Sequence, residues 1–205
     1  MEFCKPNNII PERDANCPQE LLDLTNFYTE SLDDNLHHKP GNTLSELPKG
    51  IVNIAGVDFD LRGVIQLAGH RSKEITSQDY PASVKVDNIN ISGSEICFLN
   101  ASAWNIETEK AEIGKYIVTY ERGYVAEIPL VYKENIWDWW SNDNDLSLEP
   151  IWKGNNERTT AINQHIRLFL LNWENPLPEL KIKSIELKSN CSGPGPLVAA
   201  ITIKK

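Results

Sequence analysis

Apolar residues recur along this chain mainly at every second position, in short runs that turn residues separate. In the run 57–61 (VDFDL) the apolar side chains fall on one face of a strand, while Asp58 and Asp60 fall on the face toward solvent or a ligand. The expected strands cover 21–27, 50–55, 57–61, 64–67, 84–91, 96–104, 115–120, 125–132, 166–172, 181–187 and 197–203. Their spacing is typical of sandwiches and barrels. The pattern predicts an all-β fold, an antiparallel β-sandwich of jelly-roll type.

Three local features refine this prediction. The strands 116–120 and 125–132 flank Glu121, Arg122 and Gly123, and the glycine favours a tight β-hairpin there. Pro129 has no backbone N–H to give to a neighbouring strand, so the second arm of the hairpin should lie at a sheet edge or contain a local break. The alternation in 180–187 changes phase at 183–184, which predicts a β-bulge. Helix signals are confined to single turns, at 45–47 and within 134–140.

The domain organisation follows from where the periodic pattern begins. Residues 1–19 contain Pro6, Pro11 and Pro18 and show no sustained period, so they are expected to form an extended N-terminal arm or linker. Residues 20–205 should then form a single β-sandwich domain. A chain of 205 residues is long enough to bury one substantial core.

Composition excludes several classes of protein. A net charge of -9 with dispersed basic residues disfavours a nucleic-acid partner. No apolar run approaches the ~20 residues of a membrane helix, so no membrane insertion is expected. Cys4, Cys17, Cys97 and Cys191 form no CxxC pair; they are expected to be free thiols with Cys97 buried in a strand, or else Cys4 and Cys17 bridge an N-terminal loop. The compartment stays open, with an extracytoplasmic or secreted setting favoured.

Candidate chemistry is sparse at the level of motifs. The chain carries no GxSxG, HExxH or Walker motif, and no catalytic residue is predicted. His37 and His38 would point to opposite faces of a strand, so they cannot chelate one metal together. No cofactor is expected, although the acidic run 142–145 could hold a structural calcium ion. A glycoside hydrolase would need a carboxylate pair, which Asp58, Asp60, Glu127 and Glu174 offer.

The tryptophans carry the most information about binding, because five of the six fall between Trp137 and Trp173. The segment 136–140 (IWDWW) places bulky rings on both faces of a short stretch, so at least one indole should lie in a groove or at the surface. Indole faces stack on the apolar faces of sugar rings, and polar neighbours bind the hydroxyl groups. The alternative is a Trp-rich loop that plugs one end of the sandwich. The predicted ligand-binding residues are Trp137, Asp138, Trp139, Trp140, Asn155 and Arg158.

Several short segments together also suggest a family. They are 22–28 (LDLTNFY), 47–50 (LPKG), 56–67 (GVDFDLRGVIQL), 113–116 (IGKY), 128–130 (IPL), 173–176 (WENP) and 198–202 (VAAIT). With them the chain resembles an uncharacterised β-sandwich module of bacterial multidomain proteins, similar to galactose-binding-like jelly rolls and carbohydrate-binding modules. The resemblance implies a fold and glycan binding, and no catalytic residue.

These observations predict a non-catalytic carbohydrate-binding or sensing module, with a glycan or another protein as partner. The first alternative is a protein-interaction or structural domain of a multidomain bacterial protein. The second alternative is a glycoside hydrolase that uses a carboxylate pair.

Overall fold

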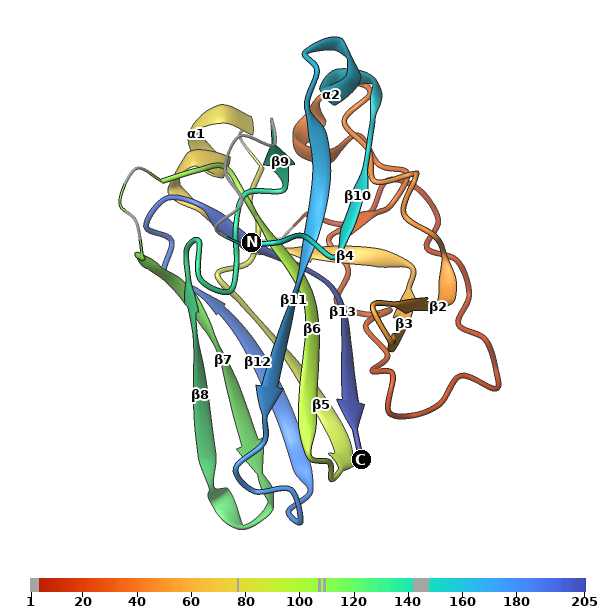
Figure 1. Cartoon of the computed structure of the whole chain (residues 1–205), viewed down its shortest axis with the longest axis vertical. Coiled ribbons are helices and arrows are strands. Elements are labelled where there is room, and N and C mark those ends of the chain that lie inside the picture. Colours follow the sequence, from red (N-terminus) through yellow and green to blue (C-terminus); the bar gives the residue numbers. More distant parts are fainter. Residues whose placement is uncertain (1–3, 77, 107, 109, 142–147) are drawn as a thin grey trace.

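The computed structural model describes residues 4–76, 78–106, 108, 110–141 and 148–205. Strands make up 45% of the described residues and helices 9%, and the strands pair in antiparallel sheets. The all-β sandwich-like architecture predicted from the periodicity is therefore confirmed. Figure 1 shows most of the long strands running along the length of the molecule, with the two α-helices near one end.

The larger sheet forms one layer. Among the described residues it has seven strands, and each pairs antiparallel with its neighbours. Its order is β1 (Glu30–Ser31), β4 (Gly63–Gln66), β13 (Gly195–Lys204), β6 (Glu95–Ala103), β11 (His165–Glu174) and β10 (Trp152–Gly154), with β9 (Trp140–Ser141) also paired to β11.

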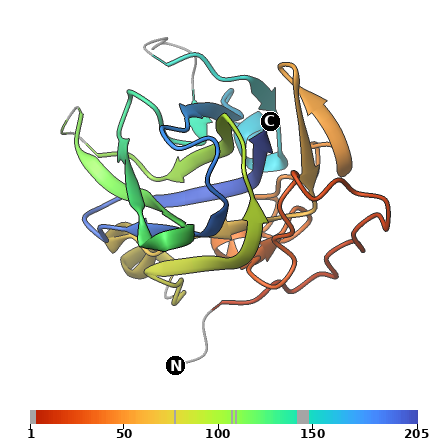
Figure 2. The same cartoon turned by 90° about the horizontal axis from the view of Figure 1, so that it is seen from below.

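A four-stranded sheet forms the facing layer, as the end-on view of Figure 2 shows. Its order is β5 (Ser83–Ile91), β12 (Ile182–Ser189), β7 (Glu112–Tyr120) and β8 (Val125–Val131). A separate hairpin joins β2 (Gly50–Ile54) to β3 (Val57–Leu61). Strand β13 contacts both β3 and β7 outside its own sheet, so it is covered on both faces and is buried along nearly its whole length.

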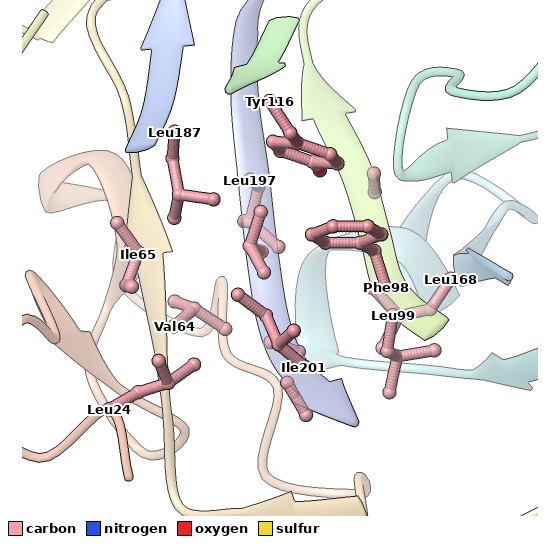
Figure 3. Packing of buried hydrophobic residues seen from close by; sticks show 14 of the residues in the cluster. Leu24, Val64, Ile65, Phe98, Leu99, Tyr116, Leu168, Leu187, Leu197 and Ile201 are labelled. Atoms are coloured by element: carbon pink, nitrogen blue, oxygen red, sulfur yellow. The ribbon is translucent and has the colours of Figure 1, made fainter. Parts of the chain in front are cut away.

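The core lies between these layers. Phe98 on β6 stacks on Tyr116 on β7, with ring centroids 4.1 Å apart and planes 18° from parallel (Figure 3). Leu187 on β12 and Leu197 on β13 lie close to this pair, and all four side chains are fully buried. Burial of this apolar surface from both sheets is the main force that holds them together.

The local predictions around the hairpin and the bulge are confirmed. β7 and β8 pair antiparallel around the 3-10 turn η2 (Glu121–Gly123), where Gly123 has a φ of +81°. Pro129 lies on β8, which is an edge strand of its sheet. The pairing of β12 shifts register between Ile182 and Ser184, where the bulge was expected.

The run 21–27 is not a strand, and this prediction is wrong. Leu21 forms a single bridge to Thr202, and the chain then turns, with the backbone N–H groups of Phe27 and Tyr28 donating to the carbonyl oxygen of Leu24. Leu22 and Leu24 are nevertheless buried in the core. The apolar alternation therefore marks core-facing side chains without a partner strand.

The helices are few and short: η1 (Leu36–His38), α1 (His70–Thr76) and α2 (Glu157–Ala161), besides η2. None of the helices in the described part of the chain is long and apolar enough to span a membrane. Helical turns were expected at 45–47 and 134–140 instead. The first forms a turn that the Leu47 N–H closes on the Leu44 carbonyl oxygen, and the second consists of turns, bridges and the start of β9. Neither is a helix.

The described part of the N-terminal segment, residues 4–19, packs along the sandwich. The backbone N–H groups of Asn7 and Asn8 donate to the Asp34 carboxylate, and Arg13 pairs with the buried Asp60 at 2.8 Å. All four cysteines are free thiols, and Cys97 is buried in β6 as predicted.

Candidate functional site

A cleft of about 270 Å³ is lined in part by residues of α1, β9 and α2. Figure 1 shows these three elements at one end of the sandwich. Aromatic, charged and amide side chains line the cleft, from stretches that are far apart in the sequence. The lining residues are His37, Lys39, Asn42, Ile75, Trp104, Asp138, Trp139, Trp140 and Arg158.

The segment 138–140 is held between two strands of the larger sheet. On the β6 side, the Ser102 N–H donates to the Trp137 carbonyl oxygen at 2.7 Å, and the Trp139 N–H donates to the Ser102 carbonyl oxygen at 2.9 Å. On the β11 side, the Arg167 N–H donates to the Trp139 carbonyl oxygen at 2.8 Å. Since both strands belong to the core sheet, they fix the positions of the two rings and the carboxylate of this segment.

Three indoles and one imidazole form the aromatic wall of the cleft. The ring centroids of Trp139 and Trp140 lie 6.1 Å apart, and the His37 ring lies 4.3 Å from Trp104 and 5.8 Å from Trp139. Trp139 is only 3% exposed, whereas Trp104 and Trp140 are half-buried. The ring surfaces that a ligand can reach therefore belong mainly to Trp104 and Trp140.

Two of these aromatic residues have an unusual backbone conformation. His37 has a φ of 60° and Trp104 a φ of 67°, in the left-handed region that bulky side chains seldom adopt. Each such residue costs about 1–3 kcal/mol, and residues of this kind concentrate at functional sites. With these backbone conformations the His37 and Trp104 rings lie 4.3 Å apart at the cleft.

Two ring nitrogens of the wall have no hydrogen-bond partner within the described residues. They are Nε2 of His37 and Nε1 of Trp140, and both atoms are buried. Most buried polar groups in proteins are paired, because an unpaired one costs about 1–3 kcal/mol. Burial lowers the pKa of His37 to about 4, so its ring is neutral at physiological pH.

Asp138 is the acidic group of the cleft lining among the described residues. Its side chain accepts a hydrogen bond from the Trp140 backbone N–H at 3.2 Å. Burial raises the pKa of Asp138 to about 7, although that hydrogen bond and the nearby Arg167 act in the opposite direction. Near neutral pH the carboxyl group is therefore divided between a protonated form, which donates a hydrogen bond, and an ionised form, which accepts.

A buried row of hydrogen-bonded side chains lies behind His37, which belongs to the aromatic wall of the cleft. The Tyr80 hydroxyl lies 2.5 Å from Oε1 of Glu30 and 2.6 Å from Oε1 of Gln78, and the Tyr80 ring packs edge-on against His37 at 6.3 Å. A hydroxyl has one proton to donate, so both contacts are satisfied when protonated Glu30 donates to Tyr80 and Tyr80 donates to Gln78. Burial raises the pKa of Glu30 to about 7, which favours this protonated form.

Four of the six residues predicted to bind a ligand meet in the cleft: Asp138, Trp139, Trp140 and Arg158. Trp137 does not line it. The guanidinium carbon of Arg167 lies 4.1 Å from the Trp137 ring centroid, and the ring also stacks on Phe169 at 6.3 Å. Trp137 is thus part of the core beside the cleft.

Asn155 lies beside a neighbouring surface hollow that residues 41–46 and 155–161 form. Its backbone N–H donates to Oε2 of Glu46 at 2.6 Å, and its Oδ1 lies 2.9 Å from Nδ1 of His165. These contacts tie the loop before α2 to the rest of the fold.

The sequence did not point to five of the lining residues: His37, Lys39, Asn42, Ile75 and Trp104. His37 was weighed only as a metal ligand, and Trp104 is the one tryptophan outside the 137–173 group. His37 and Trp104 have backbone conformations with positive φ, for which an isolated histidine or tryptophan gives no signal in the sequence.

None of the four carboxylates considered for glycoside hydrolysis lines the cleft. Asp60 is buried and accepts hydrogen bonds from Arg62, and Glu127 pairs with Lys115 at 2.7 Å on the four-stranded sheet. The candidate calcium loop 142–145 lies outside the described residues. Among the residues that the structure does describe, no group of three or more His, Cys, Asp or Glu side chains is placed to hold a metal ion.

Comparison of the chain with protein-family models, curated proteins and solved structures found no match. The resemblance to galactose-binding-like modules therefore stays a prediction.

Proposed function

We propose that the protein is a non-catalytic carbohydrate-binding module and that the cleft beside α1, β9 and α2 is its binding site. The observation that carries this proposal is the pairing of reachable indole faces with unused polar groups in one small cavity. Trp104 and Trp140 supply the faces, while Trp140 Nε1 has no partner among the described residues.

The chemistry of the lining matches that of a sugar ring. The C–H face of a sugar is apolar and stacks on an indole, whereas its hydroxyl groups both donate and accept hydrogen bonds. Asp138 can accept or donate near neutral pH, because its pKa lies at about 7. Movement of the half-buried Trp140 ring on ligand entry would bring its N–H within reach of a hydroxyl group.

The size of the cleft restricts the ligand. Small-molecule sites commonly measure about 300–1,000 Å³, and this cleft of about 270 Å³ lies just below that range. It suits a terminal sugar unit or a disaccharide better than an extended polysaccharide chain.

Isothermal titration calorimetry against a panel of mono- and disaccharides tests the proposal. Trp140→Ala removes both the ring face and the N–H, and should weaken binding several-fold or more, because an aromatic contact contributes about 0.5–1.5 kcal/mol beyond the apolar area that it buries. Trp140→Phe keeps an aromatic face and should lose less. Trp173→Ala is the matched control, because this half-buried indole lies at the other end of β11 and does not line the cleft.

The possible results either support or contradict the proposed function. Saccharide binding that Trp140→Ala weakens and Trp173→Ala leaves unchanged supports the proposal. Binding that is insensitive to Trp140, or no heat with any member of the panel, contradicts it.

A further inference from the structure

The charge of the cleft lining is opposite in sign to that of the whole chain. The chain has 29 acidic and 20 basic residues, giving a net charge of -9. Among the described residues, Lys39 and Arg158 line the cleft as cations and Asp138 is the carboxylate opposing them. Asp138 is partly protonated near neutral pH, and His37 is uncharged there. The cleft therefore has an excess of positive charge on an acidic protein.

The two cations are not engaged elsewhere in the described part of the chain. Neither Lys39 nor Arg158 takes part in an ion pair there, whereas other surface cations do, such as Lys49 with Asp33 at 2.5 Å. A cation without an acidic partner keeps its full capacity to bind an incoming anion.

Hydrogen bonds link the two segments that carry these cations. Asn156 caps α2 by accepting the Thr159 N–H at 2.9 Å, which fixes the turn of helix that holds Arg158. The Asn156 side-chain amide donates to Oδ1 of Asn42 at 3.3 Å, and the Asn42 N–H donates to the Lys39 carbonyl oxygen at 3.0 Å. The backbone positions of both cations are thus coupled at one side of the cleft.

We propose that the saccharide recognised by the cleft is acidic, with a carboxylate of the uronic-acid type held by Arg158 and Lys39. This inference rests on the proposed function and adds the ligand class to it. A guanidinium group binds a carboxylate through two parallel N–H···O hydrogen bonds, and a lysine ammonium adds a third charged contact. The sugar ring would then lie against Trp104 and Trp140.

Matched ligands test this inference by calorimetry at low ionic strength. The probes are uronic-acid disaccharides of the gluco, galacto and manno series, each compared with its methyl ester and its neutral counterpart. Methyl esterification removes the charge and keeps the sugar skeleton. We expect the acidic form of at least one series to bind about tenfold more tightly than its ester, with an advantage that shrinks as salt is added.

Variants assign this preference to the two cations. Arg158→Gln and Lys39→Gln should each reduce the acid-to-ester affinity ratio several-fold. Arg122→Gln is the matched control, since this exposed arginine lies in η2, at the tip of the β7–β8 hairpin. It should leave the ratio unchanged.

The possible failures are distinguishable. Equal affinity for acid, ester and neutral sugar, or a preference that survives both Gln variants, overturns the acidic-ligand inference and leaves saccharide binding intact. Tighter binding of a sugar phosphate than of every uronic acid overturns the carboxylate assignment in favour of a phosphate. Absence of any saccharide binding overturns the proposed function and this inference with it.

Discussion

Glu30→Gln should stabilise the protein at alkaline pH. Glu30 is fully buried on β1, and its carboxyl group lies 2.5 Å from the Tyr80 hydroxyl, which is also 2.6 Å from the side-chain oxygen of Gln78. A glutamine at this position can donate its amide N–H to Tyr80 as the protonated acid does, and it cannot ionise. The substitution therefore keeps the hydrogen-bonded chain and removes one titration.

The size of the effect follows from the pKa of the folded state. Burial raises the pKa of Glu30 from its ordinary 4.5 to about 7, and each pKa unit corresponds to about 1.4 kcal/mol. The fold therefore favours the protonated form by about 3 kcal/mol. Since the folded-state pKa of this acid is raised, its contribution to stability is fully present below pH 4.5 and is lost as the pH rises toward 7. The glutamine variant has no such loss.

Urea denaturation followed by tryptophan fluorescence measures the difference. At pH 4.5 the variant and the original protein should unfold with similar free energies, and at pH 8 the variant should be more stable by about 3 kcal/mol. His37 and Asp138 are present in both proteins, so the effect of their titration on the free energy of unfolding cancels in the difference. Glu179→Gln, at an exposed position, should show no such pH-dependent gain. A difference that is flat across this pH range, or a variant less stable at pH 8, would refute the reasoning.

The remaining predictions concern the core and the buried ion pair. Phe98→Ala removes a fully buried ring that stacks on Tyr116 at 4.1 Å, and should lower the free energy of unfolding in urea by about 3–5 kcal/mol; a loss below 1 kcal/mol would contradict the inter-sheet packing. Arg62→Met removes the guanidinium whose Nε lies 2.9 Å from the buried Asp60, and leaves this carboxylate paired with Arg13 alone, at 2.8 Å. Because one cationic partner remains, the substitution should cost about 1–3 kcal/mol by the same assay, less than a fully uncompensated buried charge would. A neutral effect of Arg62→Met at pH 7 would show that this pair contributes little to stability.

Much of the fold could be predicted because its strands bury one face in a regular alternation. The prediction failed where buried residues do not belong to a paired strand. Leu22 and Leu24, for example, are buried in the core but lie outside any strand. Helix α1 was missed for the opposite reason. Its apolar residue, Ile75, is 47% exposed, and its buried side chains are the polar Ser72 and Thr76, so it has no apolar stripe to detect.

The candidate site could be predicted only in part. The residues 138–140 stood out because three bulky rings in five positions cannot all enter one face of a sheet. His37, in η1, and Trp104, just after β6, lie about 100 and 35 residues upstream of that segment, and both have left-handed backbone conformations. Periodicity reports which side of an element faces the core. It does not report which loops meet at the end of a sandwich.

The most direct test of the proposed binding site is an NMR titration of the tryptophan indole N–H resonances with saccharide, assigned through Trp140→Phe and Trp173→Phe. We expect the Trp140 indole resonance to shift progressively and saturably with a sugar that binds in the cleft, while the Trp173 resonance stays in place. A Trp140 resonance that does not move at millimolar concentrations of any sugar in the panel would contradict the assignment of this cleft as a carbohydrate-binding site.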